Sequence, residues 1–222
     1  MHPALATLVA VPVVLIVIRQ CRKPFGFVGR LIVWQMNHTH SSLTDWALSH
    51  VEIAPRATIL DVGCGGGRTV QKLAVAASEG KVFGVDYSRQ SVAAARRTNA
   101  PSIADGRVEI QEASVAQLPF ADATFDLATA IETHYYWPDL EKNLAEVLRV
   151  LKPGGRLVLV AEAYKNGRLG FVQVLVMKPL GGKVLSADEH RDLLERAGFA
   201  EIEVREQPGK GWLCVTALRA AR

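Results

Sequence analysis

Short apolar runs alternate with stretches of helical periodicity along residues 54–222. Runs of four to eight apolar and β-branched residues predict strands, whereas apolar positions three and four apart predict helices. Glycines and prolines follow several of these segments and mark where they end. The predicted strands are 57–62, 81–85, 108–111, 125–130, 156–161, 201–205 and 211–218, and the predicted helices are 68–77, 89–99, 140–151 and 187–197.

This alternation predicts an α/β fold, Rossmann-like, with a seven-stranded and mostly parallel sheet, helices on both of its faces and an antiparallel last strand. A chain of 222 residues is long enough for one such domain with a buried core, and two full domains are not expected. Ligands of such sheets bind at the carboxyl ends of the strands, near the point where the strand order reverses. The chemistry is therefore expected where the predicted strands end.

An apolar segment, residues 1–22, precedes this domain. Residues 1–18 contain no Lys, Arg, Asp or Glu, and three basic residues follow them within the next five positions. As a helix, 18 residues extend roughly 27 Å, just short of the ~30 Å hydrocarbon core of a bilayer. Positive charge after the apolar run, rather than before it, favours attachment to the inner face of a membrane over a secretory signal. A helix buried on the domain and an initiation site further downstream are the alternatives.

The stretch 23–53 is mixed in composition. An apolar run at 31–36 and the positions Trp46, Leu48 and Val51 predict two short helices, which would form a cap ahead of the first strand. We therefore divide the chain into an apolar segment (1–22), a helical cap (23–53) and one ligand-binding domain (54–222).

The charge and cysteine content argue against several classes of protein. Lys and Arg number 26 and Asp and Glu number 22, which gives a net charge of +4 spread along the chain. Because nucleic-acid-binding proteins concentrate basic residues in one patch, no nucleic-acid partner is expected. The three cysteines are widely spaced and form no CxxC pattern, so neither a disulfide framework nor a metal site is expected. This cysteine usage fits a reducing cytoplasm.

A glycine-rich loop follows the first predicted strand. Residues 61–67 read DVGCGGG and lead into the first predicted helix of the domain. Glycines there let the backbone approach a nucleotide-like ligand, and the helix amino terminus offers N–H groups to polar ligand atoms. The dinucleotide fingerprint requires a small residue where Arg68 stands, which disfavours a nicotinamide cofactor.

An acidic residue, Asp86, ends the second predicted strand. It follows the glycine loop by about 20 residues, a spacing at which a carboxylate accepts hydrogen bonds from ribose hydroxyls. Readings without a ligand are that the glycines make plain turns and that Asp86 caps the next helix. The glycine loop and the acid together favour a nucleoside ligand.

These motifs resemble those of the class I S-adenosylmethionine-dependent methyltransferases. The resemblance extends over roughly residues 54–160 and includes QLPF at 117–120, FDL at 125–127 and LRVLKPGG at 148–155. Within the class, the chain is most similar to the small-molecule branch, the methyltransferase type 11 domain, which includes ubiquinone and menaquinone C-methyltransferases. The resemblance implies S-adenosyl-L-methionine as the cofactor.

The resemblance also implies which residues bind the cofactor. Asp61 and the glycines of the loop would surround the methionine portion of the cofactor, and Asp86 would bind its ribose. Tyr87, Ala113 and Ser114 would lie beside the adenine. The family often has an acid where Ser114 stands, so Glu112 is an alternative for that contact. The implied cofactor-binding residues are Asp61, Gly63, Gly65, Gly67, Asp86, Tyr87, Ala113 and Ser114.

The methyl acceptor needs residues of its own, and the segment 132–137, which reads ETHYYW, follows the fourth predicted strand. Aromatic faces stabilise cations, and a carboxylate or an imidazole can remove a proton from the methyl acceptor. We predict Glu132 and His134 as the catalytic residues. Tyr135, His40 and Glu162 would close the same pocket. Packing of the aromatic residues beneath the next helix is the alternative.

The sequence thus predicts an enzyme that transfers a methyl group from S-adenosylmethionine to a small, lipophilic methyl acceptor. No metal is needed, because the methyl group is already activated and the protein has only to position the reactants and exclude water. A non-catalytic S-adenosylmethionine-binding protein is one alternative. An RNA methyltransferase is another, although the sequence contains no basic patch or added RNA-binding module.

Overall fold

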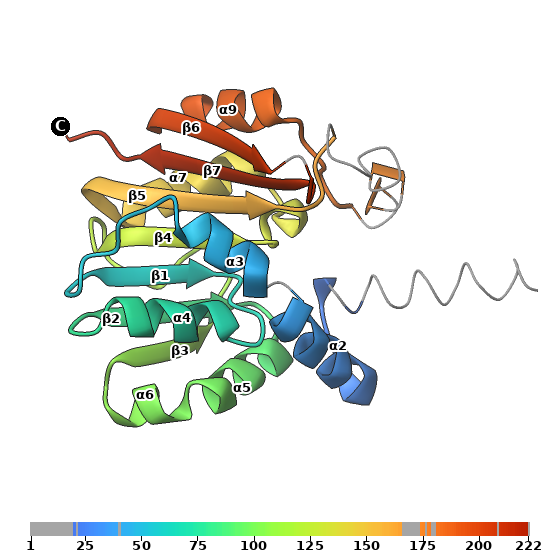
Figure 1. Ribbon diagram of the computed structural model, residues 1–222, viewed down its shortest axis with the longest axis vertical. Coiled ribbons are helices and arrows are strands. Elements are labelled where there is room, and N and C mark those ends of the chain that lie inside the picture. The colour runs from blue at the N-terminus through green and yellow to red at the C-terminus, as the bar shows by residue number, and fades with distance from the viewer. Residues whose placement is uncertain are drawn as a thin grey trace, which may run out of the picture.

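A seven-stranded sheet forms the centre of the molecule (Figure 1). The computed structural model describes residues 20, 22–39, 41–165, 174–175, 177–178, 181–207 and 209–221. The strand order is β3-β2-β1-β4-β5-β7-β6, and β7 is antiparallel to both of its neighbours while the other pairs are parallel. The predicted fold class is confirmed. The strands are β1 (Thr58–Val62), β2 (Lys81–Asp86), β3 (Val108–Glu112), β4 (Phe125–Ile131), β5 (Leu151–Ala161), β6 (Ala200–Gln207) and β7 (Trp212–Leu218).

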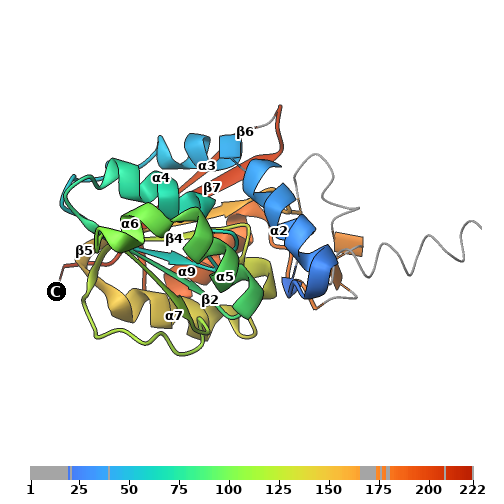
Figure 2. The same cartoon turned by 90° about the horizontal axis from the view of Figure 1, so that it is seen from below.

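Helices cover both faces of this sheet (Figures 1 and 2). The helices α3, α4, α5 and α6 lie in front of it in Figure 1, and α7 and α9 lie behind it. Each predicted helix of the domain is present, with ends within one or two residues of the prediction. Their bounds are α3 (Ser41–Leu48), α4 (Arg68–Ala76), α5 (Arg89–Thr98), α6 (Ala100–Ala104), α7 (Leu140–Val150) and α9 (Ala187–Arg196), and a short 3₁₀ helix, η1 (His134–Tyr136), precedes α7.

The alternation of side chains along the strands divides the core between the two faces. In β1, Leu60 packs with the residues of α7 and α9, whereas Ile59 packs with those of α3, α4 and α5. In β5, Leu157 and Val158 divide in the same way. Successive residues of a strand point to opposite faces, and apolar residues on both are typical of strands buried between helical layers.

Polar side chains fix where the helices of the far layer begin. Asp139 precedes α7, and its carboxylate accepts a hydrogen bond from the Lys142 N–H. Ser186 precedes α9 and forms a capping box with Glu189, in which each side chain accepts from the other residue's backbone N–H. Such caps satisfy N–H groups that the first turn of a helix leaves without partners.

Two of the described helices precede β1, where the sequence predicts a helical cap. The first, α2 (Gly26–Thr39), lies outside α5 at the edge of the molecule, as Figure 2 shows. The second, α3, packs on the sheet itself, because Leu43 and Ala47 are fully buried against residues of β1, β4 and β5. The predicted cap therefore contributes to the core of the domain.

The predicted membrane segment, residues 1–18, lies outside the described residues, as does most of the apolar segment 1–22. Among the residues that the structure describes, no helix has both the length and the apolar character needed to cross a bilayer. Of the cysteines there, Cys64 and Cys214 are free and buried.

Candidate active site

A cavity of about 400 Å³ lies at the carboxyl ends of β1, β2 and β4. The strand order reverses at β1, which has β2 on one side and β4 on the other. Connections after strands on either side of such a point run in opposite directions and leave a crevice between them. The lining comes from the loop after β1, the ends of β2 and β3, the loop after β4, and five residues from the region of α2 and α3: Arg22, Pro24, Val33, Ser41 and Thr44.

Asp61 lines the cavity, and only one of its two carboxyl oxygens has a hydrogen-bond partner among the described residues. Its Oδ1 accepts a 2.6 Å hydrogen bond from the Thr129 hydroxyl of the neighbouring strand β4. Its buried Oδ2 has no hydrogen-bond partner among the described residues. Burial raises the pKa of Asp61 to about 7, and the charge of Asp86 adds to that rise. A buried carboxyl oxygen without a partner gains most from a polar or cationic ligand group.

Three of the four glycines of the loop have positive φ angles, 75° at Gly63, 50° at Gly65 and 84° at Gly67, but they face different surroundings. A Cβ at Gly63 would lie 2.0 Å from the Thr133 hydroxyl oxygen, and a Cβ at Gly65 would enter open space. Both of these glycines line the cavity. Gly67 does not, because it packs against α5, where a Cβ would lie 2.7 Å from the Ala95 Cα.

Asp86 occupies the last position of β2 and lines the cavity. Its carboxylate accepts hydrogen bonds from the backbone N–H of Gly65 at 3.0 Å and of Ser88 at 2.8 Å. Burial raises the pKa of Asp86, and these two N–H groups oppose the rise. Because a carboxylate has about four acceptor positions, Asp86 retains capacity for further donors while it holds the glycine loop in place.

The predicted adenine-side residues Tyr87, Ala113 and Ser114 also line the cavity. The Tyr87 hydroxyl donates to the Arg22 backbone carbonyl, which joins the end of β2 to the segment before α2. Glu112, the alternative to Ser114, is exposed and pairs with Arg89 at 3.1 Å, and it is not among the residues that line the cavity.

Glu132 follows β4 and lines the cavity beside the glycine loop. Its backbone has a φ of 57°, an uncommon conformation for a residue with a side chain. Its Oε1 accepts hydrogen bonds from the Tyr135 hydroxyl, at 2.7 Å, and from the Glu162 N–H. Burial, together with the nearby charge of Glu162, raises the pKa of Glu132 to about 8. A carboxyl group with such a pKa exchanges its proton near neutral pH, as general acids and bases do.

Comparison with known proteins identifies the central part of the chain. Residues 60–159 match the family profile described as a methyltransferase domain. The chain contains a methyltransferase domain. The predicted resemblance to S-adenosylmethionine-dependent methyltransferases is confirmed by this match and by the relatives that follow.

Two curated relatives of the methyltransferase domain illustrate the similarity. An O-methyltransferase of Penicillium expansum, cnsE, is 37% identical over 153 residues, which is 67% of this chain and 54% of the relative. A demethylmenaquinone methyltransferase of Desulfitobacterium hafniense is 34% identical over 145 residues, 62% of this chain and 56% of the relative. The chain thus spans little more than half the length of these relatives.

Among solved structures, the chain is similar in fold to an S-adenosylmethionine-dependent methyltransferase from Aquifex aeolicus. The TM-score is 0.69 at 20% sequence identity, and the match covers 86% of this chain and 98% of the other. At this level of identity the likeness concerns the fold.

His134 lies away from the cavity of the methyltransferase domain, in contrast to Glu132. It is fully buried, and its Nε2 lies 3.0 Å from Nε2 of His190 on α9. His190 Nδ1 lies 2.7 Å from the carbonyl oxygen of Ser186, so it carries the proton and donates to that oxygen. His190 Nε2 is then the acceptor and His134 the donor. The sequence predicts that His134 removes a proton from the methyl acceptor. The structure corrects this prediction to a packing role, because the His134 ring faces α9.

Tyr135 and Glu162 form hydrogen bonds with Glu132 but are not among the residues that line the cavity. The Tyr135 hydroxyl donates to Glu132 and accepts from the Ala163 N–H at 3.0 Å, and Tyr135 is buried. The Glu162 carboxylate accepts from the Trp212 indole N–H at 2.7 Å. His40, the remaining predicted pocket residue, lies outside the described residues.

Several lining residues of the methyltransferase domain were not predicted from the sequence. Thr133 and Pro138 belong to the loop after β4, and the sequence assigned neither of them a role at the cavity. Trp137 is buried in the core and also lines the cavity, so packing under the next helix does not exclude a place at the cavity. The residues from the region of α2 and α3 carry no motif, and only the three-dimensional structure brings them to this site.

The buried pair of histidines predicts a loss of stability in acid. Burial lowers the pKa of His134 and of His190 in the folded protein, and the neighbouring His190 ring adds to the lowering at His134. When the pH falls through about 6.5, the unfolded chain therefore takes up protons that the folded protein does not. The free energy of unfolding should fall with pH, by up to about 1.4 kcal/mol per pH unit for each proton.

Urea unfolding between pH 7.5 and 5 measures this slope in the wild type and in His134→Phe, which keeps a buried ring but cannot titrate. A loss of stability in His134→Phe that is the same at every pH does not change the slope, so the two slopes can be compared directly. A slope that is the same in both proteins would assign the acid sensitivity to other groups.

Proposed function

We propose that this chain transfers a methyl group from S-adenosylmethionine to a small, apolar molecule. The observation that carries the proposal is the single cavity in which the carboxyl groups of Asp61, Asp86 and Glu132 and the open side of the glycine loop meet. Its volume, about 400 Å³, lies within the usual range of ligand pockets, ~300–1,000 Å³. The methyltransferase profile over residues 60–159 supports the same activity.

The residues of the cavity fit the cofactor by their chemistry. Asp86 has acceptor capacity for the two ribose hydroxyls beyond the N–H groups that it already binds. The Oδ2 of Asp61, a buried acceptor without a partner in the described residues, suits the amino group of the methionine portion. Gly65 leaves open space where any other residue would project a Cβ. Tyr87, Ala113 and Ser114 would flank the adenine.

Bound S-adenosylmethionine supplies an electrophilic methyl group on a sulfonium ion. The protein has to hold the methyl acceptor in line with that group and keep water away. The aromatic side chains of Tyr136 and Trp137 provide a wall that excludes water and accommodates a cation. Some methyl acceptors carry a proton on their nucleophilic atom. The Glu132 carboxylate, on the same wall, can accept that proton.

The part of the lining that the cofactor residues leave over includes a group of apolar residues. It contains Val33, Ile131, Trp137 and Pro138 in addition to Tyr136. Such a surface binds apolar rings and chains through the hydrophobic effect. We therefore propose a lipophilic methyl acceptor, such as a lipid quinone or a phenol.

A transfer assay with labelled S-adenosylmethionine tests the proposal against lipid quinones, phenols, thiols and amines, with RNA as the alternative substrate. Labelled product from at least one small molecule, and none from RNA, is the expected result. Transfer to RNA alone would contradict the proposed substrate class. Binding of S-adenosylmethionine without transfer to any of these compounds would favour a non-catalytic binding protein.

A further inference from the structure

The helix α2 exposes an apolar face on the outside of the molecule. Phe27, Val28, Leu31 and Trp34 are each between 49% and 67% exposed. These positions follow the spacing of one side of a helix, while Val33, on the opposite side, is buried. Burying large apolar side chains is favourable, and contiguous exposed ones mark interaction sites.

Hydrogen bonds to the end of β2 and the start of α5 hold α2 in this orientation. The Gln90 side-chain amide donates to the Gly26 carbonyl at 2.6 Å, and the Ser88 hydroxyl lies 3.4 Å from the Pro24 carbonyl. Figure 2 shows α2 on the outer side of α5. The apolar face therefore points away from the domain, and rotation of the helix to bury it would break these contacts.

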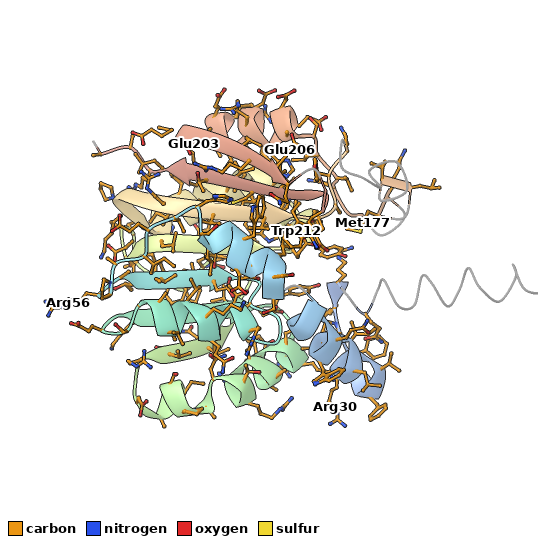
Figure 3. The ribbon with its side chains drawn as sticks, viewed as in Figure 1. Arg30, Arg56, Met177, Glu203, Glu206 and Trp212 are labelled. Atoms are coloured by element: carbon orange, nitrogen blue, oxygen red, sulfur yellow. The ribbon has the colours of Figure 1, made fainter. Side chains whose placement is uncertain are left out.

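The N-terminal segment that contains α2 carries charge of one sign. Residues 1–44 contain no Asp or Glu and four basic residues, Arg19, Arg22, Lys23 and Arg30. The Arg30 guanidinium lies 5.8 Å from the centre of the Phe27 ring, at the border of the apolar face, and Figure 3 shows the Arg30 side chain pointing away from the body of the molecule. Apolar and aromatic side chains bordered by basic ones are typical of helices that lie in the interface of an anionic bilayer.

We propose that the exposed face of α2 docks on the surface of an anionic lipid bilayer, with Phe27, Leu31 and Trp34 inserted among the lipids. The uncharged residues 1–18 immediately precede the basic residues of this region in the sequence. A membrane is therefore favoured over a protein partner. The proposal goes beyond the methyl transfer proposed above and does not depend on it, because vesicle binding is measured without any turnover.

The same helix connects the bilayer to the cavity. Val33, on the inner side of α2, and Pro24, just before it, both line the cavity. A helix of 14 residues is about 21 Å long, so docking along its length would bring the cavity close to the lipid surface. An apolar methyl acceptor dissolved in the bilayer would then reach the cavity without crossing much water.

Co-sedimentation of the full-length protein with phosphatidylcholine vesicles, with and without phosphatidylserine, tests the docking. The test variant is the double substitution Phe27→Ser and Leu31→Ser. The control is Val75→Ser, because Val75 lies on α4 and is 76% exposed. The double variant should bind the phosphatidylserine vesicles at least roughly tenfold more weakly than the wild type, since two large apolar side chains no longer insert. The control should bind as the wild type does.

A second measurement separates α2 from residues 1–18, which can bind the same vesicles. Brominated acyl chains quench tryptophan fluorescence on contact, so they should quench the wild type, and Trp34→Phe should abolish most of that quenching. This result supports the proposal even if all variants sediment equally. Equal sedimentation together with equal quenching in the wild type and Trp34→Phe would overturn it. Self-association that the double variant abolishes, without vesicle binding by the wild type, would also overturn it and assign the face to a second copy of the chain.

Discussion

Replacing Asp86 by alanine is expected to weaken the binding of S-adenosylmethionine by roughly 10- to 150-fold. The substitution removes the carboxylate that would accept hydrogen bonds from the ribose hydroxyls. A hydrogen bond to a charged group typically contributes about 1.5–3 kcal/mol. The same substitution removes the acceptor of the Gly65 and Ser88 N–H groups, which shape the adjoining loop. Both losses act on the same ligand, so calorimetric titration with S-adenosylmethionine should give a large effect.

Glu112→Ala is the matched control, since Glu112 is an acid at the end of the neighbouring strand β3. It pairs with Arg89 on the surface, a contact of little energetic value. Its removal should leave the affinity unchanged. Equal affinities of the wild type and Asp86→Ala, with both proteins folded by thermal melting, would contradict the role assigned to Asp86.

The pattern of apolar residues was sufficient to predict the strands of the sheet, because buried strands and amphipathic helices have different periodicities. It was less informative where a strand departs from regular pairing. The strand β5 begins at Leu151, five residues before the predicted start at Arg156. Leu151 pairs with Phe125 and Arg156 pairs with Leu127, so the intervening residues, Lys152–Gly155, form an irregularity in the ladder. A Pro-Gly-Gly sequence indicates a turn, and whether pairing continues across it depends on the neighbouring strand.

The cofactor side of the cavity could be predicted because its residues follow directly after strands, and the carboxyl ends of parallel strands meet at one edge. The loop after β4 was different. Glu132 and His134 are separated by one residue, yet Glu132 lines the cavity and His134 contacts α9. The turn of η1 determines these directions, and the partner of His134 lies 56 residues further along the chain. Local sequence contains neither piece of information.

The contribution of the region before β1 could not be predicted for a similar reason. The sequence of α2 predicts a helix, but nothing in it indicates that its inner side reaches the cavity. That placement depends on contacts such as the one between Tyr87 and the Arg22 carbonyl, which join segments 65 residues apart. Contacts over such distances follow from the packed fold and not from local propensity.

The substitution Glu132→Gln is expected to slow methyl transfer by ~10²–10⁴-fold, the usual contribution of a general base, and to leave the affinity for S-adenosylmethionine unchanged. Glutamine keeps an Oε1 that can accept from the Tyr135 hydroxyl and the Glu162 N–H, so the loop should retain its shape. What the variant lacks is a group that can take up a proton. Single-turnover rates and calorimetry separate the chemical step from binding.

The pH dependence provides a more specific test of the same residue. Because the pKa of Glu132 is raised to about 8, the carboxyl group is mostly protonated at pH 7 and becomes an effective base as the pH rises through about 8. In the wild type, kcat/KM should therefore rise with pH and level off above that value, and in Glu132→Gln this rise should disappear. The charge of Glu162 is the second cause of the raised pKa. Glu162→Gln should accordingly keep the rise but move it to lower pH, an effect that a purely structural role of Glu132 would not produce. Normal turnover of Glu132→Gln with the wild-type pH profile would show that the carboxyl group only supports the loop.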